Sequence, residues 1–478
     1  MQSQCSAQAR HDRLERPSGS SPREKPMPMA ESESDSKINL DEVAAPPPVY
    51  DRPGEDHLEN ELSHQAGRVE QDVERDSRPN QNGYTPTVGR EEAEKQPGRG
   101  LQSTSMRMPY VISYLIFFSF LGTLLRMVIE SLTFYPGAPV NISVLWANVG
   151  GCFIMGFLSE DQGLFRFRGV DIQVEHEDDG QRRVRLTAHK KTIPLYIGLT
   201  TGFCGSLTSF STFIRDLFLA LSDGLSVPVG PYSDISLFAA AQDAPKAPNG
   251  GFSFMAIIAV LFLEVGLSTF SIKLGAHTAV FLSSWTPRLP QWWLERIVNP
   301  CMIPLATLSW IALICIVALL PRYALDPTLW SAEIWRGPVL FALVFSPVGC
   351  LARFFLSLKL NSRLAAFPLG TFAANISGTA VLGMAYCLQH SSISAASLGG
   401  GSVVGCQVLQ GIMDGFCGCL TTVSTWALEL IDLRPRHAYV YGIISVVVAF
   451  CLLVVEIGSL KWTRGLETPI CFSASTGQ

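Results

Sequence analysis

The chain has 478 residues, of which 47% are hydrophobic and only 16% are charged, and its formal net charge is −5. This composition is typical of a membrane protein whose charges lie outside its apolar segments, and it excludes a chain that is disordered along its whole length. The net charge averages regions of very different composition, and nothing in the sequence points to a nucleic-acid partner.

Residues 1–107 are rich in Glu, Asp, Arg, Ser, Pro and Gln and have almost no aliphatic clusters. Such a segment cannot bury a core, so we expect a disordered cytoplasmic tail. No apolar stretch near Met1 resembles a cleavable secretory signal, so the first span is expected to direct insertion. The tail is interpreted as a regulatory or sorting segment, or as a solvated extension without a specific task.

Nine apolar segments follow that are long enough to cross about 30 Å of hydrocarbon. They lie at residues 109–130, 142–159, 193–221, 252–272, 301–320, 338–358, 367–389, 402–432 and 438–460. With the tail inside, the expected inner loops hold fourteen lysine and arginine residues and the outer segments hold five. This bias predicts a cytoplasmic N-terminus and an extracellular C-terminus in the lipid bilayer.

The spans fall into a pattern of four, one and four. GTLLR (122–126) returns as GCLAR (349–353), and Asn148 returns as Asn375; each asparagine follows its arginine by 22 residues (148 − 126 and 375 − 353). An even number of spans per repeat would leave directly joined copies parallel, so the single span at 301–320 is expected to invert the second copy. The sequence therefore predicts an all-α membrane protein with two inverted four-helix repeats joined by one inverting helix.

The third helix of each repeat contains a glycine-rich stretch, GFCGSLTSFSTF at 202–213 and GFCGCLTTVSTW at 415–426. Glycines and hydroxyls are poor material for an uninterrupted membrane helix, so both third helices are expected to be broken. Non-helical backbone is tolerated at membrane depth only where it is buried in protein, lines a cavity or holds an ion. The two breaks, expected to meet near the midplane, are the candidate functional site.

The predicted domains are the tail at 1–107, a first repeat at 108–275, a linker with the inverting span at 276–337, a second repeat at 338–460 and a short C-terminal tail at 461–478. The doubled motif, the G-x-x-x-R spans and PLGTFAANISG (368–378) resemble the CrcB/Fluc fluoride channels, and the fused nine-span arrangement is similar to the fluoride exporters of fungi and plants. The resemblance covers residues 109–460. It implies a fluoride-selective channel, not an enzyme, that exports fluoride down its electrochemical gradient across the plasma membrane, and it suggests a monomer containing both repeats.

The resemblance also implies roles for the matching residues. Main-chain carbonyl groups at the breaks are expected to hold one structural sodium ion, at Gly205, Thr208, Gly418 and Thr421. Water or side-chain hydroxyls filling the breaks are the alternative. The ring edges of Phe210 and Phe213 are expected to face the anion, whereas the second copy has Val423 and Trp426 at these positions.

Polar side chains complete the expected anion pathway. Asn148 and Asn375 match an asparagine whose amide can donate to a dehydrating anion, or can hold helices together. Tyr441 and Ser445, four residues apart, are expected to form a polar track on one helix face, and the first copy carries Glu264 instead. Further candidates, each of which could merely bond its own helix, are the hydroxyls of Ser211, Thr212, Ser424 and Thr425.

Four charged residues accompany these motifs. Arg126 and Arg353 are expected toward opposite membrane faces, where they would concentrate anions at each vestibule or snorkel to the headgroups. Asp216 and Glu429 follow the two motifs at the same offset (216 − 213 and 429 − 426) and could cap a helix, pair with an arginine or carry a proton.

The first copy keeps the aromatic pair and the second keeps the tyrosine and serine, so we expect one competent pathway built from both halves and one decayed pathway.

Two other functions stay open from the sequence. The chain could be an inverted-repeat secondary transporter that exchanges an anion for protons through Glu264, Asp216 or Glu429. It could also be a non-conducting membrane scaffold whose tail is the active part. An intramembrane enzyme is not supported, because no nucleophile and base pair or metal set falls on a common face. Cys417 and Cys419 lack the second ligand pair of a metal site.

Overall fold

The computed structural model describes residues 104–133, 138, 140–161, 163–165, 186–222, 224–225, 250–319, 336–391, 403–467 and 469. All of them belong to one unit, Asn39–Gln478. Every regular element among these residues is a helix, as the composition predicts. The predicted disordered tail lies outside the described residues up to residue 103, and most of the expected C-terminal tail and of the charged insertion at 160–191 lies outside them too.

The elements of the first half end in a helix that leads toward the linker. They are α2 (Thr104–Thr133), α3 (Leu145–Glu160), α6 (Pro194–Ile197), the π-helical η2 (Gly198–Cys204), α7 (Gly205–Leu207), α8 (Phe210–Leu221), α10 (Gly250–Leu261), the π-helical η3 (Phe262–Gly266) and α11 (Leu267–Phe281). Pro194 occupies the first turn of α6, where its missing N–H costs nothing. Ser209 precedes α8 and accepts a hydrogen bond from the Thr212 N–H, which fixes a new helix start in mid-span.

The linker and the second half follow the same order of long helices. They contain α12 (Gln291–Trp293), the π-helical η4 (Leu294–Val298), α13 (Asn299–Leu319), α15 (Arg336–Leu360), the 3₁₀ turn η5 (Asn361–Arg363), α16 (Leu369–His390), α18 (Val403–Gly411), the π-helical η6 (Ile412–Cys417), α19 (Gly418–Leu420), α20 (Ser424–Asp432), α21 (Pro435–Leu453), the π-helical η7 (Val454–Gly458) and α22 (Ser459–Thr463).

Six described helices are long and apolar enough to cross a membrane: Met108–Thr133, Gly250–Phe281, Gln291–Leu319, Val339–Arg363, Leu369–Gln389 and Pro435–Thr463. The other three expected spans are helical as well, but α3 has only 16 residues and both third helices are interrupted. The chain is therefore a membrane protein, and the count of nine spans stays a prediction.

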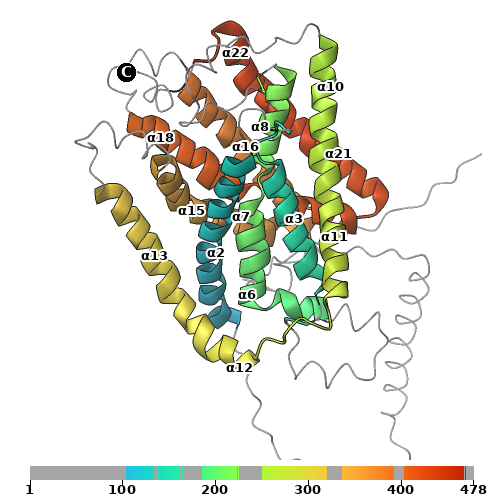
Figure 1. Cartoon of the computed structure of the whole chain (residues 1–478), viewed down its shortest axis with the longest axis vertical. Coiled ribbons are helices and arrows are strands. Elements are labelled where there is room, and N and C mark those ends of the chain that lie inside the picture. Colours follow the sequence, from blue (N-terminus) through green and yellow to red (C-terminus); the bar gives the residue numbers. More distant parts are fainter. Residues whose placement is uncertain are drawn as a thin grey trace, which may run out of the picture. The chain divides into compact units, whose positions relative to one another are not determined.

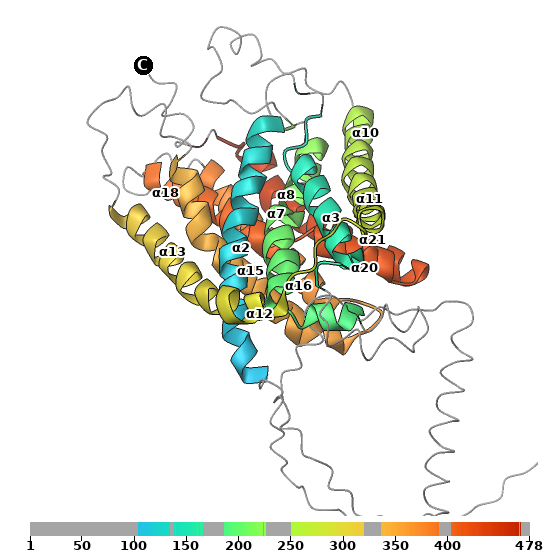
Figure 2. The same cartoon turned by 60° about the horizontal axis from the view of Figure 1, so that its bottom comes forward.

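The two halves pack around their first and third helices. A Cβ atom added to Gly122 would collide with the Phe203 carbonyl oxygen, and one added to Gly349 would collide with that of Phe416, so α2 and α15 each dock closely on the third helix of their own half. The first helices, α2 and α15, also pack against each other, and the short helices α7 and α19 are in contact. Figures 1 and 2 show α13 beside α2, away from α10 and α11.

Candidate functional site

Both predicted helix breaks are present at the residues that the glycine-rich motifs indicate. Thr208, after α7, is extended (φ −98°, ψ 146°), and Thr421, after α19, is extended in the same way (φ −88°, ψ 155°). Each threonine N–H still bonds the carbonyl four residues earlier, at 3.1 and 2.9 Å. Because both threonines are extended, their carbonyl groups turn out of the helical hydrogen-bond ladder.

The two breaks satisfy each other's backbone. The Thr208 hydroxyl accepts a hydrogen bond from the Ser424 N–H at 3.1 Å, and the Thr421 hydroxyl accepts one from the Ser211 N–H at 3.1 Å. The Thr208 hydroxyl also lies 3.1 Å from the hydroxyl of Thr422. All five residues are buried. The start of each second half-helix is therefore capped by a threonine from the opposite break, a reciprocal arrangement.

The two asparagines hold the break of their own half. The Asn148 side-chain oxygen accepts the Ser209 N–H at 2.9 Å, and the Asn375 oxygen accepts the Thr422 N–H at 2.8 Å. The amide nitrogens differ, since that of Asn148 donates to Glu264 and that of Asn375 donates to the Thr422 carbonyl oxygen at 3.2 Å. Helix stabilisation, one of the two predicted uses, is thus visible in the structure, and the contact with an anion stays a prediction.

The burial of Arg126 and Arg353 contradicts one of their two predicted roles, snorkelling to the headgroups, and the vestibule role stays a prediction. Both are only 2% exposed, so neither snorkels to the membrane surface. Arg353 donates to the carbonyl oxygens of Gly205 and Thr201 at 2.6 and 2.5 Å, and Arg126 donates to that of Asp414 in the opposite half. The physical reason is that the π-helical stretches η2 and η6 loosen the helical ladder and offer carbonyl oxygens to a buried guanidinium.

The aromatic residues of the motif form one buried cluster that joins the halves. The Phe210 and Phe213 rings are perpendicular (86°) with centroids 5.6 Å apart, and Phe210 also meets Trp426 at 5.3 Å and 64°. All three side chains are at most 1% exposed, and Val423 is equally buried. Edge-on ring pairs present hydrogen-bearing edges inside the protein, the electrostatic property that the predicted anion contact requires.

A second buried network surrounds Glu429. The Tyr441 hydroxyl donates to one carboxyl oxygen at 2.6 Å, and the Thr371 hydroxyl donates to the other at 2.6 Å. Tyr441 and Ser445 lie on the buried face of α21, as their spacing predicts. However, the Ser445 hydroxyl donates to the Tyr441 carbonyl oxygen at 2.7 Å, which is the local bond that a helical serine commonly makes.

Of the remaining predicted residues, Thr212 and Thr425 lie at the breaks, and Asp216 contacts the start of the second helix. Thr212 lies with its hydroxyl 2.9 Å from that of Ser209, and the Thr425 N–H donates to the Thr422 hydroxyl at 3.5 Å. Asp216 accepts the N–H and the hydroxyl of Ser143 at 2.9 and 2.7 Å and pairs with Arg215 at 3.2 Å. Of the three predicted uses of this acidic residue, pairing with an arginine is therefore seen for Asp216.

Sequence reasoning missed the residue of the second half that is equivalent to Glu264. The segment FLEVG (262–266) forms η3 and VVEIG (454–458) forms η7, so Glu264 and Glu456 occupy the same place in two π-helical turns. The shared E-[VI]-G pattern could have revealed this pair.

Cys417 is buried, and the described residues contain no group of three or more His, Cys, Asp or Glu side chains that could hold a metal ion.

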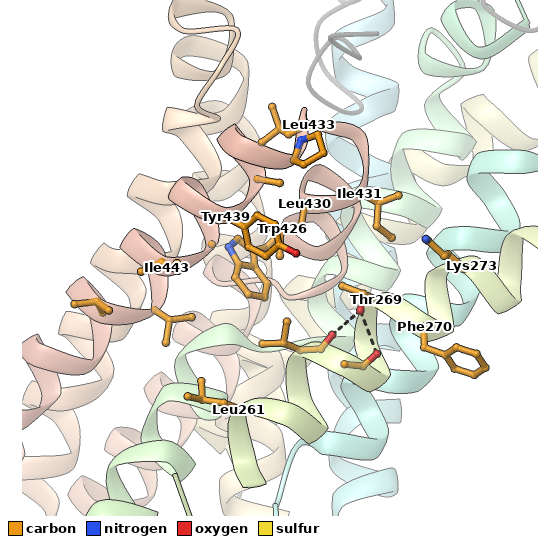
Figure 3. Close-up of a pocket in the computed structure, with 17 residues that line it drawn as sticks. Leu261, Thr269, Phe270, Lys273, Trp426, Leu430, Ile431, Leu433, Tyr439 and Ile443 are labelled. Atoms are coloured by element: carbon orange, nitrogen blue, oxygen red, sulfur yellow. Dashed lines mark hydrogen bonds between the residues drawn. The ribbon is translucent and has the colours of Figure 1, made fainter. Parts of the chain in front are cut away.

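A groove of about 910 Å³ runs between the fourth helix of the first half and α20 and α21 of the second. Figure 3 shows Lys273 and Phe270 on one side of the groove, and Tyr439, Ile443 and Trp426 on the other. Its lining is mostly apolar, and Phe270 and Ile443 are exposed, so the groove belongs to the hydrocarbon-facing side of the site.

Comparison with known proteins places this site in a family. The family model described as CrcB-like protein, Camphor Resistance (CrcB), matches twice, at residues 113–241 and 340–458, and each match includes one break. Fluoride export protein 1 of Neurospora crassa is 46% identical over 382 residues, covering 76% of this chain and 69% of its own. The protein of that name in Candida albicans is 32% identical over 373 residues, covering 77% and 84%.

A bacterial relative matches one repeat's length of the chain. The fluoride-specific ion channel FluC of Pseudomonas aeruginosa is 36% identical over 137 residues, which are 27% of this chain and 98% of its own. No solved structure matches the chain. On the two family matches and the similarity to the Neurospora protein, the chain belongs to the CrcB-like protein family.

Proposed function

We propose that this protein is a fluoride-selective channel that exports fluoride from the cytoplasm and so protects the cell from fluoride toxicity. The observation that carries the proposal is the pair of reciprocal helix breaks, which brings buried hydroxyls, amides and ring edges of both halves together. The relatives named as fluoride export proteins and as a fluoride-specific ion channel support it, because the family matches include both breaks.

The competent pathway is proposed to run beside α8, between α16 and α21. These three helices pack against one another, and they carry Phe210, Asn375 and Tyr441. The aromatic pair of the first half lies in the same buried cluster as the tyrosine of the second half, which supports a pathway built jointly from both copies. Ring edges and neutral donors can replace water around a small anion without a full positive charge that would trap it.

The layout is proposed to have nine spans, with the second repeat inverted relative to the first. The reciprocal contacts support it: Arg353 reaches Gly205 and Thr201, and Arg126 reaches Asp414 at the corresponding place. Reciprocal contacts of this kind are what a two-fold relation produces. A monomer with both repeats, a cytoplasmic N-terminus, an extracellular C-terminus and a plasma-membrane location complete the proposal.

A structural sodium ion at the centre is also proposed. The residues fit it, since the Thr208 and Thr421 carbonyl groups are turned out of the helix and carbonyl oxygens suit a hard cation. The Gly205 carbonyl accepts from Arg353, and its second lone pair remains for an ion. With Gly418 at the matching place, these groups would hold an ion whose fixed charge ties the halves together.

Passive export needs no nucleotide. In an acidic medium fluoride enters the cell as neutral HF, which ionises in the cytoplasm. An inside-negative potential then drives the anion out with about 2.3 kcal/mol per charge per 100 mV. The sequence contains no G-x-x-x-x-G-K-[ST] phosphate-binding loop, in agreement with a passive pathway.

The deciding experiment is fluoride efflux from liposomes that contain the purified protein. Valinomycin and a potassium gradient set the voltage, and chloride serves as the control anion. We expect voltage-driven fluoride release without chloride release. Flux that requires a proton gradient would indicate a coupled transporter instead, and no flux at all would leave the scaffold function.

A further inference from the structure

The two asparagines beside the breaks face different partners, and this difference separates the two pathways. In the first half the Asn148 amide nitrogen donates to the Glu264 carboxyl oxygen Oε2 at 2.9 Å, while its oxygen accepts the Ser209 N–H. Both polar ends of each asparagine are engaged, since the Asn375 oxygen accepts the Thr422 N–H at 2.8 Å, so the halves differ in the group that accepts from the amide nitrogen. In the second half the Asn375 amide nitrogen donates to the neighbouring Thr422 carbonyl oxygen at the longer distance of 3.2 Å.

The counterpart of Glu264 does not occupy the corresponding place. Glu456 has the same position in its π-helical turn, but its carboxyl lies beside Gly383, where an added Cβ would collide with Oε2. Gly383 is eight residues, about two helical turns, beyond Asn375 (383 − 375). Glu456 is also only partly buried, whereas Glu264 is 1% exposed. The same motif therefore brings a carboxyl to one asparagine and leaves the other without it.

The chemistry of this carboxyl opposes anion passage. Ionised or neutral, a carboxyl group accepts a hydrogen bond, so Oε2 of Glu264 takes the Asn148 N–H that a dehydrating anion would use. Its second oxygen, Oε1, is buried without a hydrogen-bond partner among the described residues. In its ionised form Glu264 also repels fluoride, because among the described residues it has no hydroxyl donor, whereas the two oxygens of Glu429 accept from Tyr441 and Thr371.

We infer that Glu264 closes the second pathway, the one that lies beside α20 between α3 and α11. These three helices pack against one another in the same way that α8, α16 and α21 do. The inference rests on the proposed channel function and assigns to one residue the asymmetry between the pathways. Glu264 is then a plug: removing its carboxyl frees the Asn148 amide and opens this route to fluoride.

The test compares matched variants in the liposome efflux assay. Phe210→Ile disables the competent pathway, and Val423→Phe gives the second copy the ring that it lacks. This double variant is expected to release no fluoride above empty liposomes. Adding Glu264→Ser is expected to raise voltage-driven fluoride release about tenfold or more above the background of empty liposomes, since the Asn148 amide then becomes free to donate to the anion. Adding Glu456→Ser instead, at the counterpart, is expected to restore nothing.

Each outcome decides the inference. Fluoride release from the double variant with Glu264 in place would overturn it, and so would equal rescue by Glu456→Ser. A silent Glu264→Ser triple variant that elutes from size exclusion as the wild type does would overturn it too; one that fails to fold is replaced by Glu264→Met, which keeps a similar length and removes the oxygen that accepts the Asn148 N–H. Failure of the wild type to release fluoride would instead contradict the proposed function, because that result does not involve Glu264.

Discussion

The buried carboxyl group of Glu429 has two hydroxyl partners of its own. It is fully buried, and its two oxygens accept from Tyr441 and Thr371, each at 2.6 Å. Hydrogen bonds to a charged group are about twice as strong as neutral ones, so the pair compensates the carboxylate for the water that it loses. The tyrosine that the sequence singles out for the anion thus also holds an acid.

Replacing Tyr441 by Phe should impair both stability and flux. The ring remains against Phe367, at 5.0 Å, but Glu429 loses one donor, which should cost about 1–3 kcal/mol of unfolding free energy. The less compensated carboxylate should repel fluoride and lower the efflux severalfold. Thermal denaturation in detergent and liposome efflux measure the two effects. Tyr439→Phe, two residues away and 72% exposed, is the control, and equal behaviour of the two variants would refute the role given to the hydroxyl.

Among the elements, the second helix of each half supports the break through one glycine. An added Cβ on Gly151 in α3 would collide with the Thr208 methyl group, and one on Gly378 in α16 would collide with that of Thr421. Both threonines are also fixed by the hydroxyl bonds across the breaks, so their side chains have little freedom to move. Each break is therefore fixed by helix packing as well as by hydrogen bonds.

Gly151→Ala and Gly378→Ala should each destabilise the protein by about 1–3 kcal/mol, because the added methyl overpacks the break. Gly150→Ala, one residue away, meets nothing within 4 Å and should be neutral or slightly stabilising, since alanine favours a helix. Thermal denaturation of the three variants makes the comparison. If Gly150→Ala destabilised the protein as much as Gly151→Ala, the loss of stability would come from a general intolerance of α3 to alanine and not from the contact with Thr208.

At the scale of the whole molecule, motif repetition predicted that the two helix breaks meet, but not which bonds their residues and neighbours make. Extended backbone at Thr208 and Thr421 follows from glycines and hydroxyls in an apolar segment, which is a local property of the sequence. The arginine contacts depend on π-helical turns in the opposite half, which no local pattern in Arg126 or Arg353 encodes. Glu264 reaches its asparagine only because α3 and α11 approach closely, a feature of tertiary packing.

Arg126 and Arg353 each donate to carbonyl oxygens of the opposite half, so the stability of each half should depend on the arginine of the other. Removing Arg353 leaves the carbonyl oxygens of Gly205 and Thr201 without this buried donor, at about 1–3 kcal/mol for each unsatisfied group, so Arg353→Met should lower the thermal midpoint clearly. Lysine should rescue poorly, because an ammonium lacks the planar fork that reaches both oxygens. Arg126→Met should behave alike, since Arg126 makes the reciprocal contact.

Arg363→Met is the matched control, because this arginine lies in an exposed turn after α15. Its thermal midpoint and fluoride efflux should stay near those of the wild type, as surface substitutions usually change stability by less than about 0.5 kcal/mol. If Arg126→Met and Arg353→Met proved as stable as this control while both lost efflux, the arginines would act on the anion, as the vestibule role predicts. If the variants lost stability as well as efflux, the main role of the arginines would be to hold the two third helices together.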